Sequence, residues 1–163
     1  MTPDDGEHDA YRWHDDTIYA LHFDAPDPDR GVWRSDLVLD IDHIVEWICG
    51  ADGRCRFRVA PATLVFHEVA DLRIAVDFGT SAFRGMLNEL SIDAIVRMPD
   101  PSGPQGAGPP RFLWRIGLTV PPGGEIGFGA TGFSEVLRAA PELRDEQRLP
   151  ASTRPHLVRR GGG

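Results

Sequence analysis

Carboxylates and histidines gather in three short stretches of the sequence, where their spacing could serve a metal ion or acid–base chemistry. Alternation along a strand would place Asp40 and Asp42 on one face, about 7 Å apart, which suits a shared ion. Imidazole and carboxylate groups are ligands of divalent transition metals. The three stretches are WHDD (His14, Asp15, Asp16), LDIDHIVE (Asp40, Asp42, His43, Glu46) and FHEV (His67, Glu68). The candidate metal ligands are His14, Asp40, Asp42, His43 and His67.

The same pattern is also typical of the wet face of a half-exposed strand, and we favour this second interpretation. Neither HExxH nor a paired CxxC motif occurs, so no constrained metal-ligand spacing is present. We therefore predict an acidic binding surface, no cofactor and no catalytic residue. Trp33 lies between charged residues in a turn-rich stretch, which makes it a candidate interface anchor. The predicted surface comprises Asp15, Asp16, Trp33, Asp40, Asp42 and Glu46.

Nucleophilic catalysis finds little support in the sequence. No serine lies in a GxSxG elbow, and neither cysteine has a motif that marks it as activated. Every basic residue is Arg, so a Schiff-base lysine, a P-loop lysine and a lysine general base are excluded. We expect a protein that binds rather than an enzyme.

The elements that would carry these residues are predicted to be β-strands, because hydrophobic residues alternate with period two. Pro61 is expected to interrupt one strand, because it cannot donate a ladder hydrogen bond. A phase slip near Asp42–His43 indicates a β-bulge. The expected strands cover 17–25, 36–48, 63–69, 71–78, 90–98, 111–120 and 125–133, and a short helix capped by Ser134 covers 134–143. The predicted fold is mainly all-β, an antiparallel sandwich or open barrel of six to seven strands with one short C-terminal helix.

The chain of 163 residues is predicted to form one domain. We place an acidic N-terminal arm at 1–12, a single β-rich domain at 13–144 and a loose C-terminal tail at 145–163. A Pro/Gly-rich loop interrupts the domain at 99–110.

Charge is distributed unevenly along the chain and bears on the kind of partner. Residues 1–50 hold 13 acidic and 3 basic side chains, and residues 51–163 hold 12 acidic and 14 basic ones, giving the net charge of −8. An acidic chain is a poor ligand for nucleic acid. A one-sided acidic surface suits a basic protein partner, although solubility alone would also explain it.

Cysteine use and the absence of a long apolar run favour a cytoplasmic location. No stretch approaches the roughly 18 apolar residues that a membrane span needs, and the N-terminus lacks a signal-peptide pattern. We therefore expect Cys49 and Cys55 to be free thiols. They flank a short loop, so a cross-hairpin disulfide or half a metal site is the alternative.

Four stretches, HDDTIYALHF, LVLDIDHIVEW, VAPATLVFHEVADLRIAVDF and LSIDAI, resemble a group of small bacterial β-rich proteins. The shared patterns are HD-x-x-I, L-x-L-D-I-D-x-I and L-x-F-H-x-V-x-D-L. These proteins are similar to immunity proteins of polymorphic toxin systems. The resemblance covers roughly residues 13–98, with a weaker echo through ATGFSEVLRA. It implies a cytoplasmic protein that binds a toxin domain, whose basic cleft acidic side chains could block.

The end of the sequence, HLVRRGGG, supports a different function. A basic segment before Gly161, Gly162 and Gly163 resembles the conjugation tail of ubiquitin-like proteins, although the third glycine departs from the usual double-Gly ending. The sequence thus predicts a non-enzymatic cytoplasmic binding protein, and its sharpest form is an immunity protein that neutralises a basic toxin domain through an acidic face. The alternatives are a metal-dependent enzyme using the His/Asp clusters and a ubiquitin-like modifier. No nucleic acid or membrane partner is expected, and the oligomeric state stays open.

Overall fold

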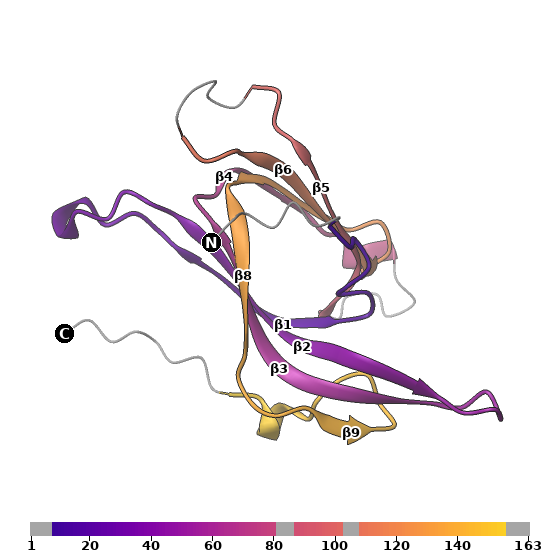
Figure 1. Cartoon of the computed structure of the whole chain (residues 1–163). Coiled ribbons are helices and arrows are strands. Elements are labelled where there is room, and N and C mark those ends of the chain that lie inside the picture. Colours follow the sequence, from indigo (N-terminus) through magenta and orange to yellow (C-terminus); the bar gives the residue numbers. More distant parts are fainter. Residues whose placement is uncertain (1–7, 81–86, 103–107, 156–163) are drawn as a thin grey trace.

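A computed structural model describes residues 8–80, 87–102 and 108–155 of the chain. Antiparallel strands curl around a central core (Figure 1), in the order β4-β7-β6-β5-β1-β2-β3-β8, with β9 paired to β3. The predicted all-β, open antiparallel architecture is confirmed. The strands are β1 (Thr17–Asp24), β2 (Asp36–Cys49), β3 (Cys55–His67), β4 (Ala70–Ala75), β5 (Leu90–Pro99), β6 (Phe112–Val120), β7 (Glu125–Ala130), β8 (Gly132–Leu137) and β9 (Glu142–Arg144). Three 3-10 turns occupy Pro28–Arg30, Phe78–Thr80 and Ala151–Thr153.

The sheet curls because, in two places, the chain bends sharply between one strand and the next with almost no loop between them. β3 leads into β4, and β7 leads into β8. His67 in β3 pairs with Gly132 in β8, and Ala70 in β4 pairs with Gly129 in β7. Glu68, between β3 and β4, has a φ of +55°, a left-handed conformation that redirects the strand. The bent segments therefore run side by side and bring the two ends of the strand order together.

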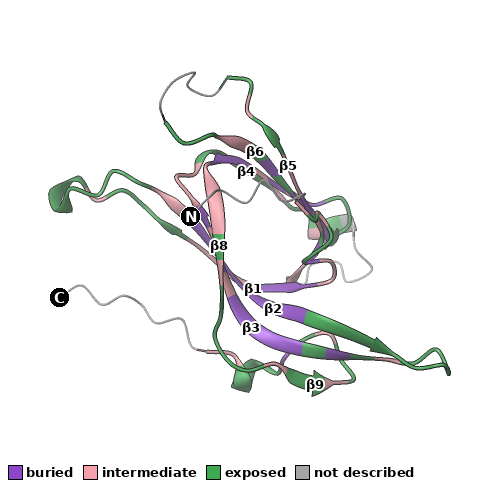
Figure 2. Cartoon of the chain, in the orientation of Figure 1, coloured by how far each residue is buried: buried purple, intermediate pink, exposed green. Residues whose placement is uncertain are grey.

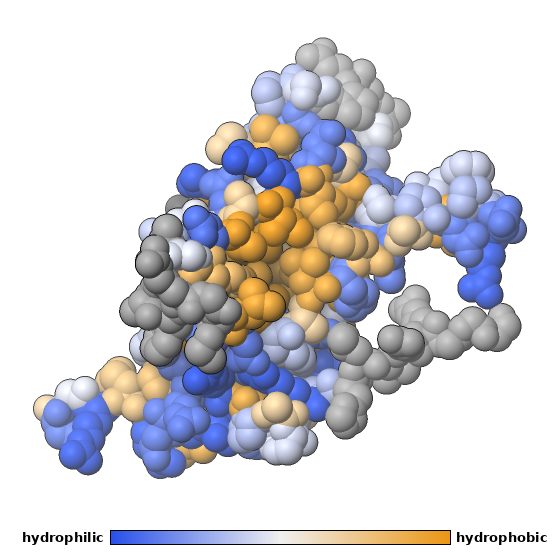
Figure 3. Space-filling model, turned by 180° about the vertical axis from the view of Figure 1, so that it is seen from behind, coloured by the Kyte–Doolittle hydropathy of each residue, from blue (hydrophilic) through white to orange (hydrophobic). Residues whose placement is uncertain are grey.

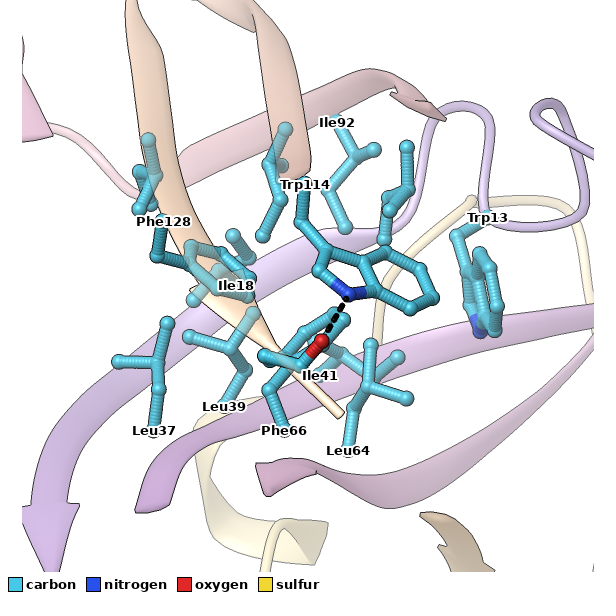
Figure 4. Packing of buried hydrophobic residues seen from close by; sticks show 14 of the residues in the cluster. Trp13, Ile18, Leu37, Leu39, Ile41, Leu64, Phe66, Ile92, Trp114 and Phe128 are labelled. Carbon is cyan, nitrogen blue, oxygen red and sulfur yellow. Dashed lines mark hydrogen bonds between the residues drawn. The ribbon is translucent and has the colours of Figure 1, made fainter. Parts of the chain in front are cut away.

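The core lies inside this curl, where alternating side chains of opposite strands meet (Figure 4). The ring centroids of Phe66 and Trp114 are 5.1 Å apart in an edge-to-face arrangement. The indole nitrogen of Trp114 donates to the carbonyl oxygen of Ala130 at 3.4 Å. Hydrophobic residues alternate along β6, and of these Trp114, Ile116 and Leu118 are buried, whereas Phe112 and Val120 at the two ends of the strand are partly buried.

A second, smaller cluster lies where residues 145–155 cover the sheet. Ile44 and Val59 pack there with Leu149, which is only 4% exposed. The tail predicted to be loose from Asp145 onward is therefore packed as far as the structure describes it, because Leu149 buries its side chain. Residues 156–163 lie outside the described ranges. The register shift in β2 falls between Ile44 and Glu46, slightly beyond the predicted bulge at Asp42–His43.

The predicted helix at 134–143 is wrong. Residues 132–137 form β8 along the edge of β3, and β9 follows. Backbone pairing to β3 overrides the local helix preference of SEVLRA, since tertiary context routinely outweighs propensity. Within the described residues, helical structure consists of 3-10 turns alone.

Pro61 does not interrupt β3, contrary to the prediction. The strand continues through it, and Pro61 pairs with Asp42 of β2. Its carbonyl oxygen accepts a hydrogen bond from the backbone N–H of Arg138, so the backbone nitrogen and carbonyl group of Pro61 point away from β2. On that side β8 pairs with β3 from Ala62 and β9 pairs up to Val59. Pro61 falls between the two partners, where its missing N–H removes no ladder bond.

The hairpin of β2 and β3 ends in a disulfide between Cys49 and Cys55, whose Cα atoms are 4.0 Å apart. The expectation of free thiols is therefore wrong for this structure, and the cross-hairpin alternative holds. The two residues are register partners in the β2–β3 ladder, which brings their side chains together. Trp47 is 45% exposed on the same hairpin and packs on Phe57.

The described end of the N-terminal arm lies against the sheet. His8 Nε2 is 2.7 Å from the carbonyl oxygen of Ile95, and its ring meets Trp114 edge-on at 5.3 Å. The backbone N–H of Ile95 donates to the carbonyl oxygen of Ala10. Residues 8–12 therefore extend the packed body, and residues 1–7 lie outside the described ranges.

Candidate functional site

The acidic residues predicted to form one exposed surface are divided between the interior and the surface. Asp16, Asp40 and Asp42 are buried, which corrects the prediction that they face solvent. Asp15 is partly exposed and accepts a hydrogen bond from Gln147. Glu46 is exposed and lies 2.9 Å from the guanidinium of Arg58. Alternation along a strand could not distinguish the buried from the exposed acidic residues. A strand face that another segment covers can carry the same polar residues as a face exposed to solvent.

Asp16 and His43 form a buried pair between the N-terminal segment and β2. An Asp16 carboxylate oxygen lies 2.6 Å from His43 Nδ1, and its other oxygen accepts from the backbone N–H of Ile44 at 2.8 Å. Burial raises the pKa of Asp16. Burial alone would lower the pKa of His43, but the hydrogen bond and charge of Asp16 outweigh it and raise that pKa. The pair therefore retains one proton more firmly than the separate groups would.

Glu135 of β8 completes the surroundings of His43. Its carboxylate accepts from the indole N–H of Trp13 at 2.7 Å and from the guanidinium of Arg12 at 3.0 Å. His43 Nε2 lies 3.9 Å from Glu135. The His43 side chain is only 7% exposed, so a substrate would not reach the ring without displacing its neighbours. The geometry fits a polar clamp that joins residues 12–16, β2 and β8.

Asp42 faces the other side of β2 and belongs to a separate network. Its carboxylate lies 2.6 Å from the guanidinium of Arg154 and accepts from the backbone N–H of Leu149 at 3.0 Å. The same guanidinium also pairs with Glu89, and its carbon lies 4.5 Å from the ring centre of Tyr19. Arg154 therefore fastens residues 145–155 across β2 and β1.

The charges of this network shift the pKa values of its members. The hydrogen bond from Arg154 lowers the pKa of Glu89. Burial disfavours the charged form of Arg154, but its bonds to Glu89 and Asp42 outweigh this and raise its pKa. Burial, together with the negative charges of Asp40 and Asp42, raises the pKa of Tyr19 to about 12. Glu89 and Arg154 are thus charged at neutral pH, and Tyr19 is neutral.

The histidines and carboxylates proposed as metal ligands do not converge. His14 bonds to the carbonyl oxygen of Asp93, and His67 lies between Asp36 and Ser134. Asp40 accepts from Thr63, whereas His43 turns to Asp16 on the opposite face from Asp42. Across the described part of the chain, no three His, Cys, Asp or Glu side chains gather in a way that could hold a metal ion.

Trp33 lies on a hairpin that projects from the body of the protein (Figure 1). This projecting hairpin, residues 23–34, links β1 to β2. Figure 2 shows its tip as exposed, and Trp33 itself is 76% exposed. Phe23 and Val32 are exposed on the same hairpin. Of the residues predicted to contact a partner, Trp33 is therefore the most accessible.

Hydrogen bonds order the tip of the projecting hairpin. Asp27 and Val32 exchange two backbone hydrogen bonds, both of 2.9 Å. Gly31 has a φ of +71°, a left-handed conformation that glycine adopts without a steric penalty, and its N–H donates to Pro28. Trp33 is thus presented by a defined turn, with the carboxylates of Asp24 and Asp29 exposed nearby in the chain.

Comparison with known proteins adds no assignment: no family model matches the chain, and neither curated proteins nor solved structures give a match. Within residues 8–80, 87–102 and 108–155, no helix has the length and apolar character to cross a membrane. The predicted conjugation tail, Gly161 to Gly163, lies outside the described residues.

Sequence reasoning missed Arg12, Glu89, Glu135 and Arg154. Each partners a residue far away along the chain, and none lies in a recognisable motif. Trp13, which precedes His14, Asp15 and Asp16, was the only local sign of a polar clamp, because a buried indole N–H needs an acceptor.

Proposed function

We propose that this chain is a non-enzymatic binding protein that engages a basic protein partner through the projecting hairpin, with Trp33 as its anchor. The observation that carries this proposal is the 76% exposure of a tryptophan on an ordered hairpin outside the body of the fold. Tryptophan is enriched among interface residues that contribute most to binding. A single indole buried on association would remove a large apolar area from water.

The order of the hairpin supports this role. The paired Asp27 and Val32 hold the turn before any partner arrives. Association therefore costs less conformational entropy than it would for a flexible loop. Asp27 also lies 3.7 Å from Arg30, which leaves the exposed carboxylates of Asp24 and Asp29 as the negative groups facing outward.

Charge supports a basic partner. The chain carries a net charge of −8, which attracts a cationic protein and raises its association rate. The buried Asp16, Asp40 and Asp42 contribute nothing to direct contacts, because their side chains are inside. The contact surface is thus the hairpin and its carboxylates, rather than the whole acidic first third of the chain.

The sharpest form of the proposal is an immunity protein that neutralises a basic toxin domain in the bacterial cytoplasm. The resemblance of residues 13–98 to that class supports it. Disulfides are rare in a reducing cytoplasm, so this location requires the β2–β3 hairpin to keep its shape with Cys49 and Cys55 reduced. The projecting hairpin lies at the other end of β2 and does not depend on that bond.

The test is site-specific photo-crosslinking in lysate of the source organism. A benzophenone side chain at position 33 is compared with one at position 143, an exposed leucine in β9 that Figure 1 places well away from the hairpin. We expect one discrete adduct at position 33 and none at position 143, with mass spectrometry identifying a basic protein.

Affinity measurements with the purified protein that the crosslink identifies complete the test. Trp33→Ala is expected to weaken binding by about 30-fold, in the range of an interface hot spot, whereas Leu143→Ala leaves it unchanged. Asp24→Arg with Asp29→Arg should weaken binding most at low salt. Equal affinity of the Trp33→Ala and Leu143→Ala proteins would refute the hairpin as the binding site.

A further inference from the structure

A serine, a histidine and an aspartate lie in a row across three neighbouring strands. His67 Nε2 is 3.0 Å from the hydroxyl oxygen of Ser134, and His67 Nδ1 is 3.4 Å from a carboxylate oxygen of Asp36. The other carboxylate oxygen of Asp36 accepts from the backbone N–H of Glu68 at 3.0 Å, which holds the carboxylate beside the ring. Serine, imidazole and carboxylate in this order form the arrangement that turns a serine hydroxyl into a nucleophile.

Strand register builds this Asp36–His67–Ser134 array. Asp36 is the first residue of β2 and His67 the last of β3, and the β2–β3 register continues past its final pair to set them opposite each other. Ser134 of β8 pairs with Val65, two positions before His67. Its side chain is therefore a diagonal neighbour of His67 on the same face of the sheet.

The array faces solvent rather than the core. The side chains of His67 and Asp36 are 40% and 26% exposed, and Ser134 is exposed. Phe66 and Phe133, the neighbours of His67 and Ser134 in the chain, pack with the core, so alternation turns the array to the other face. In Figure 1, β8 crosses the side that faces the reader, whereas Figure 3 shows apolar side chains gathered in a hollow on the opposite side. A ligand in solution can thus reach the Ser134 hydroxyl without disturbing the core.

The hydrogen bonds also fix where the proton of the neutral imidazole lies. A carboxylate only accepts, so Nδ1 of His67 carries the proton that it donates to Asp36. Nε2 is then the acceptor, and the hydroxyl of Ser134 donates to it. We propose that Ser134 accepts an acyl group from a short, activated ester, with His67 as the general base and Asp36 as the residue that positions it.

The transfer balances without a further reactant. The Ser134 oxygen forms a bond to the acyl carbon while His67 Nε2 takes the hydroxyl proton. The bond from the acyl carbon to the leaving alcohol then breaks, and His67 returns the proton to that alcohol. An ester and a serine thus become a seryl ester and an alcohol, with no oxidation or reduction.

The surroundings of Ser134 suit a small acyl group. Val136, two positions further along β8 on the same face, is 55% exposed and offers a short apolar contact. The outer edge of β8 has no partner among the described strands, so its backbone N–H groups can donate to the ester carbonyl oxygen. This site goes beyond the binding role of the projecting hairpin and does not rest on it.

The experiment treats the full, oxidised chain with p-nitrophenyl acetate, follows nitrophenolate release and locates the acetyl group by mass spectrometry. The chain contains no lysine, so the most common competing acceptor in proteins is absent. The disulfide keeps Cys49 and Cys55 from reacting. We expect a stoichiometric burst of nitrophenolate and an acetyl group on Ser134.

Variants of the array separate its three roles. Ser134→Ala should abolish the burst, and His67→Gln should slow it by about 100-fold, as loss of a general base does. Asp36→Asn should slow it by about tenfold or more. Asp36→Glu should recover part of the rate, because it restores the carboxylate that a purely structural role would not need. Melting temperatures establish that each variant is folded.

The chain offers a matched control for the serine and one for the histidine. Ser102 is exposed and donates to the carboxylate of Asp100 at 2.7 Å. His14 is 42% exposed and bonds to a backbone carbonyl oxygen. Ser102→Ala and His14→Gln should both leave the burst unchanged.

Two outcomes would overturn the proposal. One is acetylation of Ser134 at the same rate in the His67→Gln protein, and the other is acetylation of Ser102 to the same extent as Ser134. Continued nitrophenolate release that requires both Ser134 and His67 would support the nucleophile and would instead refute the non-enzymatic role proposed above.

Discussion

Asp42 and Arg154 lie 112 positions apart in the sequence, yet their side chains meet at 2.6 Å on one face of β2. Asp42 is fully buried, so this contact is the main compensation for removing its charge from water. The contact also fixes the path of residues 145–155, which cross the sheet and place Arg154 beside Asp42.

Removing Arg154 should destabilise the protein strongly. Arg154→Ala leaves the Asp42 carboxylate buried without its cation, which typically costs about 3 kcal/mol or more of unfolding free energy. Urea denaturation followed by circular dichroism measures the loss.

Arg148→Ala is the matched control for this prediction. Arg148 also approaches Glu89, at 3.7 Å, but it is largely exposed, so its removal should cost less than about 0.5 kcal/mol. Similar small losses for both variants would contradict the assignment of Arg154 as the partner of a buried charge.

Stability should fall as the pH rises above neutrality, because of the Asp16–His43 pair. The pKa of His43 is raised above its ordinary value of 6.5, so above that pH the unfolded chain has lost a proton that the folded pair keeps. The unfolding free energy should therefore decrease with rising pH until the folded pKa is passed, by at most about 1.4 kcal/mol per pH unit. Denaturation midpoints between pH 6 and 9 measure this slope.

Asp16→Asn tests the origin of that slope. The amide oxygen can still accept from the backbone N–H of Ile44, but the negative charge beside His43 is gone. The dependence on pH should then flatten or reverse, because burial alone lowers the pKa of His43. His67→Gln, at a half-exposed histidine, should leave the slope intact; a slope that vanished there instead would place the titrating group elsewhere.

A buried phenylalanine and an exposed one should differ in how much their loss destabilises the protein. Phe66→Ala removes a fully buried ring that contacts Trp114 and Phe128, and it should cost about 3 to 5 kcal/mol through lost burial and a residual cavity. Phe23→Ala, at an exposed position on the projecting hairpin, should change the unfolding free energy by less than about 0.5 kcal/mol. Calorimetric melting of both variants would contradict the core assignment if the two losses were equal.

Oxidation of the Cys49–Cys55 pair should stabilise the β2–β3 hairpin modestly. The bond closes a short loop with a sequence separation of 6, so we expect about 2 kcal/mol of extra stability over the reduced protein. Thiol titration should find no free thiol in the oxidised protein and two after reduction. Binding through Trp33 should survive reduction, and loss of binding would mean that the two hairpins act together.

The strands that the sequence predicts well are those with one face on the core. In β2 the alternation of the buried Leu39 and Ile41 is visible because each is followed by an aspartate. β6 behaves in the same way through Trp114 and Ile116. Local pattern was sufficient there because burial on one face has the same period as the strand.

The environment of the acidic residues could not be predicted, since it depends on segments that arrive from elsewhere in the chain. Asp40 and Asp42 have the spacing of a solvent-facing pair, but residues 145–155 cover Asp42, and Asp40 accepts a hydrogen bond from Thr63 of β3. The helix predicted at 134–143 failed for a related reason. A free edge of β3 was available to residues 132–137, and no local pattern shows where such an edge will be.

The consecutive residues Asp42 and His43 disfavour any shift in the register of β2. Asp42 is satisfied by a residue from the C-terminal part of the chain, and His43 by Asp16 from the N-terminal part, on opposite faces. A slip of one position would send each side chain to the wrong face and leave both without partners. Segments from the N-terminal and C-terminal parts of the chain thus fix the register of β2. Asp16 does so on the face that carries His43, and Arg154 on the face that carries Asp42.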